Sequence, residues 1–124
     1  MQKIEEEARQ FMQDRLFINE VITPDLYENL AGQTAIFPKD KALEYLALGM
    51  TSEAGEVAGK VKKIIRDGKG NKEAIAYEIG DVLWYCAMLS SELNVNLGKI
   101  MEDNLRKLND RKQRGTLRGS GDSR

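Results

Sequence analysis

The sequence predicts an all-α protein, an antiparallel helical bundle of about four to five helices in one domain spanning residues 1–124. Long stretches place apolar residues three and four positions apart, as on one helix face, and no segment alternates like a half-buried strand. The composition, 41% hydrophobic and 31% charged over 124 residues, is sufficient for one buried core. The Gly-, Ser- and Arg-rich segment 115–124 is expected to be a non-helical tail.

The first part of the chain contains two short helical candidates. Residues 4–21 are compatible with a helix, although several β-branched residues near the end weaken that interpretation. Thr23 and Pro24 have the pattern of an N-cap followed by proline in the first helical turn, and they predict a second short helix reaching Thr34. Pro38 ends this region, because the residue before a proline avoids the α conformation.

Two longer helices follow and are expected to pack side by side. The first begins at 39–40 and runs to about Asp67, with Gly68 as its C-cap. The second begins after the N-cap Asn71 and continues to a break at 94–96. Because the connection between them is so short, the two helices should be antiparallel neighbours. A last amphipathic helix follows the break and precedes the tail.

The composition excludes several classes of function. The chain has no histidine and a single cysteine, so imidazole-dependent triads, histidine zinc sites and intrachain disulfides are excluded. A net charge of −1 argues against a protein that coats nucleic acid. No apolar run approaches the roughly 20 residues of a membrane span, and no signal peptide precedes the acidic N-terminus. We therefore expect a cytoplasmic protein with neither a nucleic-acid nor a membrane partner.

Two acidic pairs mark the two long helices. Glu53 and Glu56 on the first, and Glu78 and Asp81 on the second, are each three residues apart and project from one helix face. Both pairs lie at the edge of an apolar stripe, so antiparallel packing would bring them together. One such pair is more often a solvated helix face, but four converging carboxylates would repel one another without a cation between them. An all-oxygen ligand set favours Mg²⁺, with Mn²⁺ as the alternative.

Other polar residues accompany the acidic pairs. Lys60 follows Glu56 by about one helical turn, and Asn104, Lys107 and Arg111 form a strip beside the apolar arc of the last helix. The three basic residues would face the phosphates of a substrate that bridges the metal. Three glycines inside the first long helix indicate either close helix contact or room for a ligand: Gly49, Gly55 and Gly59.

Taken together, these motifs resemble a known family. The segments SEAGEVAGKVKK and YEIGDVLWY are similar to the signature of the MazG-type nucleoside triphosphate pyrophosphohydrolases, and the resemblance extends over about residues 27–124. It implies an all-α bundle, Mg²⁺ bound by the acidic residues, and cleavage between the α and β phosphates to release pyrophosphate and a nucleoside monophosphate. Carried over by position, the metal ligands would be Glu53, Glu56, Glu78 and Asp81.

The sequence departs from the family pattern at Ser52, where the pattern has a glutamate. In that family, the glutamate at this position is credited with helping to orient the attacking water. Because this chain has a serine there, the identity of its general base is left open. Either Glu53 or Glu56 takes the catalytic role, or the metal alone lowers the pKa of the water enough.

The resemblance also implies substrate contacts and assembly. The basic residues named above would stabilise charge on the phosphates, and Asn104 would hydrogen-bond a phosphate or sugar oxygen. The nucleobase of the substrate would stack on Trp84 or Tyr85, although an aromatic residue on a helix is more often part of the core. Arg118 and the tail glycines would close over the phosphates, including from a neighbouring subunit. Members of this family are commonly dimers or tetramers, so we expect a homo-oligomer.

Several functions are compatible with the sequence. The favoured one is a (d)NTP pyrophosphohydrolase in nucleotide-pool house-cleaning, a hydrolase acting on acid anhydrides. Related all-α enzymes would act on phosphoribosyl-ATP or dUTP instead, and a substrate panel separates these. A non-catalytic helical binding module, whose acidic edge binds a basic partner, would show no effect of Mg²⁺ on its melting temperature.

Overall fold

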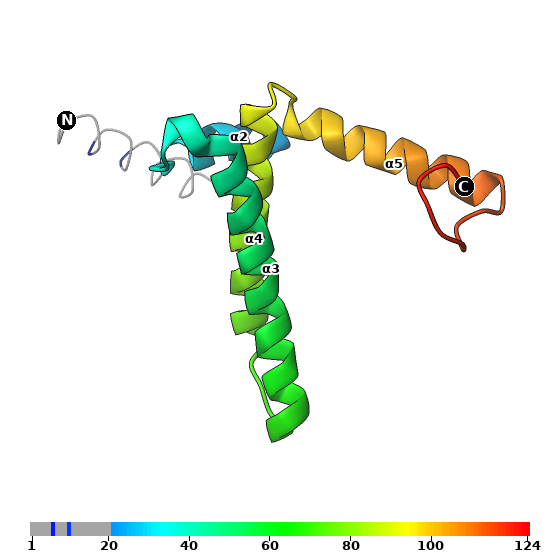
Figure 1. Cartoon of the computed structure of the whole chain (residues 1–124), viewed down its shortest axis with the longest axis horizontal. Helices are drawn as coiled ribbons and strands as arrows, with labels where there is room; N and C mark the ends of the chain where they lie inside the picture. Colours follow the sequence, from blue (N-terminus) through cyan, green and yellow to red (C-terminus); the bar gives the residue numbers. More distant parts are fainter. Residues whose placement is uncertain (1–5, 7–9, 11–20) are drawn as a thin grey trace.

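The structure is a computed structural model, and it describes Glu6, Gln10 and residues 21–124. The described part of the chain is all-helical and contains no strand (Figure 1). The helix expected over 4–21 lies outside the described residues, apart from three positions. The described elements are α2 (Pro24–Gly32), the 3-10 turn η1 (Lys39–Lys41), α3 (Ala42–Asp67), α4 (Lys72–Glu92) and α5 (Leu97–Gln113).

Local capping chemistry sets three of these helix ends as predicted from the sequence, whereas α3, expected to begin at 39–40, begins at Ala42 after the turn η1 and without a side-chain cap. The Thr23 hydroxyl accepts a hydrogen bond from the Leu26 amide at 3.1 Å, which fixes the start of α2. The Asn71 side chain likewise accepts from two amides in the first turn of α4. Gly68 ends α3 in the left-handed conformation (φ 69°), and its N–H donates to the carbonyl of Ile64 at 2.8 Å.

Helix α2 is shorter than expected, because it ends at Gly32 rather than reaching Thr34. The Thr34 hydroxyl donates to the Ala31 carbonyl at 2.8 Å and accepts a hydrogen bond from the indole N–H of Trp84, also at 2.8 Å. Thr34 therefore belongs to the connection between α2 and η1, which is tied to α4.

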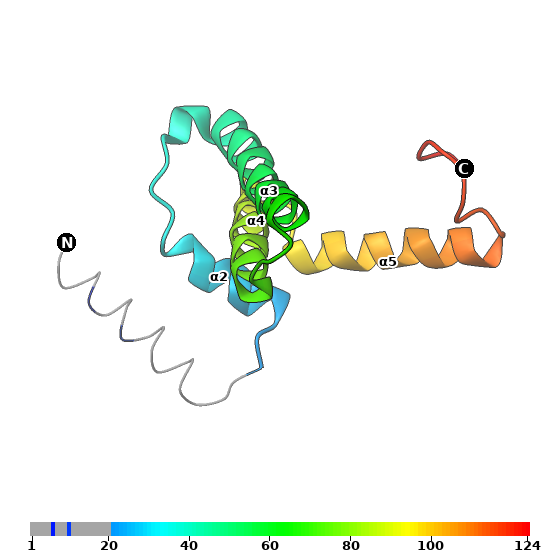
Figure 2. The same cartoon turned by 90° about the horizontal axis from the view of Figure 1, so that it is seen from below.

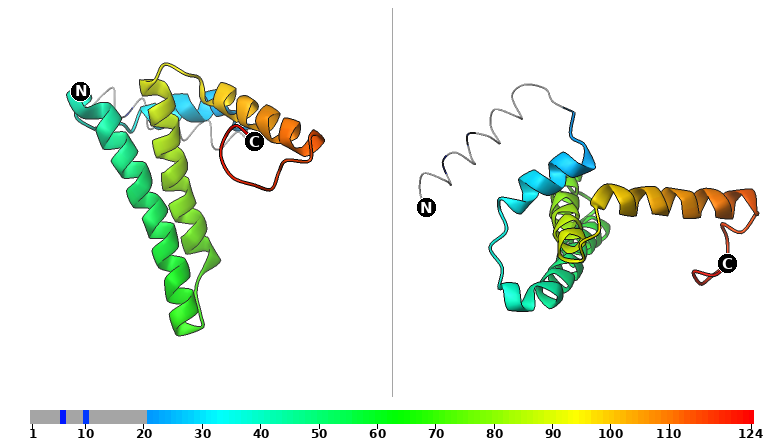
Figure 3. Two further views of the ribbon diagram at one scale, coloured as in Figure 1. Left: turned by 45° about the vertical axis from the view of Figure 1, so that its right-hand side comes forward. Right: turned by 90° about the horizontal axis from the view of Figure 1, so that it is seen from above.

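Helices α3 and α4 form a long antiparallel hairpin, as expected from their short connection (Figure 3). Helix α2 packs across the end of this hairpin that lies farthest from the α3–α4 turn (Figure 1). The buried core is small and lies at that end, where α2, α3 and α4 meet. Its members are Ala31, Leu46, Ala87 and Met88.

Helix α5 leaves the bundle and extends away from the α3–α4 hairpin (Figures 1 and 2). Its start is anchored to α2, where the Asn96 side chain donates to Asp25 and the Leu97 amide donates to Glu28. The tail after α5 turns back beside the end of that helix (Figure 1). Within the described residues, no helix combines the length and apolar character required to cross a membrane.

Candidate metal centre and flanking pockets

The site lies along one stripe of residues on each helix of the hairpin. Residues separated by three and four positions share one helix face, so each stripe runs along its helix. The stripe on α3 contains Gly49, Glu53, Glu56, Lys60 and Lys63, and the stripe on α4 contains Ala74, Glu78, Asp81 and Tyr85. The antiparallel direction of the helices places the beginning of one stripe opposite the end of the other.

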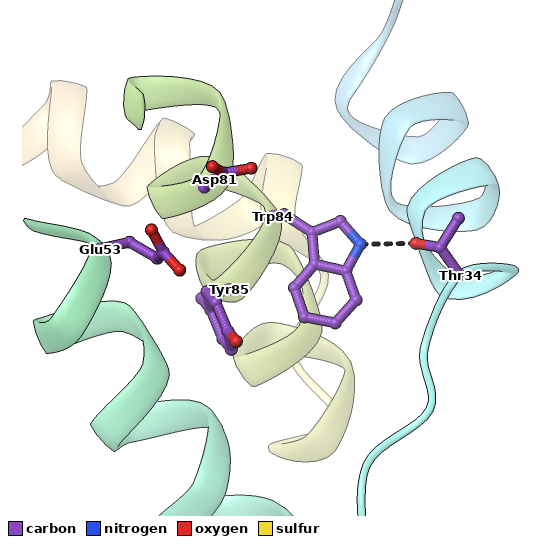
Figure 4. Close-up of a pocket in the computed structure, with 5 residues that line it drawn as sticks. All are labelled: Thr34, Glu53, Asp81, Trp84 and Tyr85. Atoms are coloured by element: carbon purple, nitrogen blue, oxygen red, sulfur yellow. Dashed lines mark hydrogen bonds between the residues drawn. The ribbon is translucent and has the colours of Figure 1, made fainter. Parts of the chain in front are cut away.

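Three of the four predicted carboxylates come together in the middle of these stripes. Glu53, Glu78 and Asp81 each offer an oxygen that lies within 4.8 Å of the other two. Glu53 and Glu78 are partly buried, and Figure 4 shows Glu53 and Asp81 facing the same space between α3 and α4. Oxygen ligands at this separation can bind one hard divalent cation.

The electrostatics of the cluster fit such a cation. Partial desolvation raises the pKa of Glu53 above its ordinary value, and the negative charges of Asp81, Glu78 and Glu56 raise it further. The ammonium of Lys60 lies 3.2 Å from a carboxylate oxygen of Glu78 and offsets part of this repulsion. Three ionised carboxylates and one ammonium leave two uncompensated negative charges, which a divalent ion would neutralise.

Glu56 lies outside this cluster. It is exposed on the same stripe, one turn beyond Glu53, and its carboxylate does not join the three that converge. Its charge nevertheless contributes to the raised pKa of Glu53.

A cleft of about 370 Å³ adjoins the carboxylates on the side toward α2 (Figure 4). It is lined by Thr34, Glu53, Asp81, Trp84 and Tyr85. The rings of Trp84 and Tyr85 meet edge to face, with their centroids 4.9 Å apart and their planes at 83°. The sequence did not point to Thr34, which was expected inside a helix. The one feature that could have indicated it is the tendency of threonine to hydrogen-bond to nearby backbone groups and so to compete with the helix.

Gly49 is required for the packing of Tyr85 against α3. A Cβ atom at this glycine would lie 2.1 Å from the Tyr85 ring, so any larger residue would displace the aromatic side chain. By contrast, a Cβ atom at Gly55 or Gly59 would meet nothing within 4 Å. Of the two explanations for the glycines, close helix contact therefore applies to Gly49, and open space applies to Gly55 and Gly59.

The residues predicted on the last helix and tail lie elsewhere within one chain. Asn104 and Lys107 are exposed on the part of α5 that extends away from the hairpin. Arg111 is only 5% exposed, and its guanidinium donates to the backbone carbonyl of Asp122 in the tail at 3.1 Å. Arg118 is exposed in the same tail. The structure therefore brings Lys60, but none of these four, to the acidic cluster.

The fold and this site define a helical protein in which a cluster of three carboxylates that could hold a metal ion lies beside an aromatic cleft. The family model of the MazG nucleotide pyrophosphohydrolase domain matches residues 41–116, so the chain belongs to this family. It is also 43% identical over 111 residues to Gene 37 protein of Mycobacterium phage L5, with 81% of this chain and 97% of that protein covered. No solved structure matches the chain.

Proposed function

We propose that this protein is a Mg²⁺-dependent nucleoside triphosphate pyrophosphohydrolase that cleaves (d)NTPs to (d)NMPs and pyrophosphate. Its task would be nucleotide-pool house-cleaning in the cytoplasm. The observation that carries the proposal is the convergence of Glu53, Glu78 and Asp81 within a MazG domain. Members of this family generally use a divalent metal, and the all-oxygen donor set here suits Mg²⁺, with Mn²⁺ as a substitute.

The chain's own residues would divide the chemistry between them. Glu53, Glu78 and Asp81 would hold the cation, and Glu56 would join them after a change of rotamer. The bound cation would neutralise phosphate charge and lower the pKa of the attacking water. We assign Glu53 as the general base in place of the family glutamate that Ser52 replaces, because its carboxylate lies in the acidic cluster where the cation would hold the attacking water. Glu56 is the alternative base.

The aromatic cleft would take the nucleoside. Trp84 and Tyr85 line it directly beside the acidic cluster. A nucleobase stacked on either ring would therefore leave the phosphates of the same nucleotide near the carboxylates. On the other side of the cluster, Lys60 would stabilise phosphate charge.

We also propose that the protein works as a homo-oligomer, a dimer or a tetramer. Within the part of the chain that the structure describes, the apolar side of α5 is largely uncovered, with Met101 50% exposed, Leu105 67% and Leu108 41%. A second copy packed on this side would bury it. Asn104 and Lys107 belong to the same helix, so their proposed contacts with phosphate would be made in that assembly. Arg111 and Arg118 would take part after rearrangement of the tail.

Product analysis of the purified protein with each canonical NTP and dNTP, with and without Mg²⁺, tests the proposed reaction. Monophosphate and pyrophosphate, formed only when the metal is added, are the expected products. Diphosphate and orthophosphate would overturn the assigned point of attack. No turnover of any canonical nucleotide would overturn the proposed activity.

A further inference from the structure

The turn between α3 and α4 carries a strong positive charge. Residues 60–72 contain six basic side chains and one acidic side chain, Asp67. That aspartate is already paired with its neighbour Arg66, whose Nε lies 2.7 Å from the carboxylate. Most of the basic charge at this end of the hairpin is therefore uncompensated by acidic groups of the same segment.

Three of these lysines surround a pocket of about 150 Å³: Lys60, Lys63 and Lys69. The turn that carries Lys69 packs tightly on α3, since a Cβ atom at Gly70 would lie 2.0 Å from the side chain of Ile64. This close approach holds the turn against the end of α3, where Lys63 and Lys69 both line the pocket. The pocket also includes Ala74 on the first turn of α4.

The charge of this pocket comes from ammonium groups rather than from the start of α4. The Asn71 side chain accepts hydrogen bonds from the amides of Glu73 and Ala74, at 2.9 and 3.3 Å. Those first-turn donors are therefore already used by the chain itself. An anion in the pocket would be bound mainly by the lysine side chains.

Lys60 connects the lysine pocket to the acidic cluster, because it lines the pocket and its ammonium lies 3.2 Å from Glu78. Along α4, the residues Ala74, Glu78, Asp81 and Tyr85 follow one another at intervals of three or four. Each interval corresponds to about 5 Å along the helix axis. The lysine pocket, the acidic cluster and the aromatic cleft therefore lie in this order along the hairpin.

A nucleoside triphosphate presents terminal phosphates, the α phosphorus and the base in the same order. We propose that the lysine pocket binds the β and γ phosphates of the substrate and retains them as the pyrophosphate leaving group. This inference rests on the proposed function. It adds Lys63 and Lys69 to the site and fixes the direction in which the substrate lies along the hairpin.

The reaction explains why charge is needed at this position. The water oxygen forms a bond to the α phosphorus, and the bond from that phosphorus to the oxygen bridging toward the β phosphorus breaks. The bonding pair leaves with the pyrophosphate, and the water proton passes to a carboxylate of the acidic cluster. Negative charge therefore increases on the β and γ phosphates, where Lys63 and Lys69 would stabilise it.

Binding of inorganic pyrophosphate, measured by isothermal titration calorimetry in the presence of Mg²⁺, tests this pocket directly. Lys63→Gln and Lys69→Gln are each expected to raise the Kd for pyrophosphate about tenfold, the usual loss for one charge-assisted hydrogen bond. Binding of a nucleoside monophosphate should be unchanged, because that product lies on the other side of the acidic cluster. Lys63→Arg should restore most of the affinity.

Lys62→Gln is the matched control, since it removes the same charge from an exposed residue of α3 that does not line the pocket. It should leave the Kd for pyrophosphate within about twofold of the wild type. An equal loss in this control, or unchanged affinity in the two pocket variants, would overturn the inference. If NTPs are hydrolysed but the Kd for pyrophosphate does not depend on Lys63 and Lys69, only the pocket assignment fails. If no NTP is hydrolysed while that dependence persists, the proposed function fails instead.

Discussion

The α3–α4 hairpin and α5 are both amphipathic, yet among the described residues the two helices of the hairpin pack on each other along much of their length and α5 does not. Leu46 on α3 is fully buried, whereas Leu105 on α5 is 67% exposed. The acidic cluster forms where two helices pack within one chain, and the polar strip of α5 extends into solvent. The same apolar spacing therefore predicts a helix face but not the molecule that covers it.

The ion pairs of the two regions differ in the same way. Lys60 and Glu78 join α3 to α4 across the hairpin. Three pairs along α5, the last of them made by its C-cap residue Arg114, link residues four apart and stabilise only that helix. They are Lys99–Asp103, Arg106–Glu102 and Arg114–Asp110. Helix α5 is thus locally supported as a helix while its apolar side is left uncovered.

The largest effect is expected from removing one carboxylate of the hairpin. Asp81→Asn should reduce turnover at least about 100-fold, because loss of a metal ligand removes several kcal/mol of stabilisation from the transition state. The far-UV circular dichroism should remain helical, since the side chain is nearly isosteric. Steady-state kinetics at saturating Mg²⁺ provides the measurement.

Glu92→Gln serves as the control for that variant, because it removes an exposed carboxylate from the last turn of the same helix. Its turnover should match that of the wild type. Full activity in Asp81→Asn would show that this carboxylate is not a metal ligand.

The next effect concerns the uncovered side of α5. Leu105→Glu should weaken self-association at least about 100-fold, because it removes a leucine that the second copy would bury and places a charge in an apolar interface. Size-exclusion chromatography with light scattering would report the change in molar mass. Ile36→Glu introduces the same charge at a residue that is 95% exposed in the connection before η1, and it should leave the molar mass unchanged. A wild-type protein that is monomeric at all concentrations would contradict the proposed assembly.

The smallest effects compare two glycines of α3. Gly49→Ala should lower the free energy of unfolding by about 1–3 kcal/mol, because the added methyl group overlaps the Tyr85 ring. Gly55→Ala should raise it by up to about 1 kcal/mol, because alanine favours a helix and the added atom meets open space. Urea denaturation of the three proteins measures both changes. Equal shifts in the two variants would mean that the ring does not constrain position 49.

Features determined by local chemistry were predictable from the sequence. The caps at Asn71 and Gly68 follow from side-chain and backbone preferences within a few residues. The helical period and the short turn were sufficient to bring three of the four acidic residues together. Glu56 differs from Glu53 because it is exposed to solvent. Residue spacing alone does not predict which of the two carboxylates joins the cluster, since that depends on how each side chain is oriented.

Features determined by distant contacts were not predictable. The end of α2 depends on the hydrogen bond between Thr34 and Trp84, which are 50 residues apart. The direction of α5 depends on the turn before it, where Asn94 adopts a left-handed conformation with φ 54°. Neither feature leaves a periodic signal, so the sequence placed Lys107 and Arg111 beside a cluster from which α5 leads them away.

The hydrogen bond between Trp84 and Thr34 also limits what the aromatic cleft can distinguish. The indole N–H donates to Thr34 and to the Ala31 carbonyl, and the Thr34 hydroxyl donates to that same carbonyl. Both donors are thus engaged within the chain, and an indole has no other hydrogen atom to donate. A base held here, as proposed, would meet Trp84 as a flat surface, on which purines and pyrimidines differ in overlap but not in hydrogen-bonding pattern. At this ring, selectivity would follow the size and polarisability of the base rather than its Watson–Crick edge.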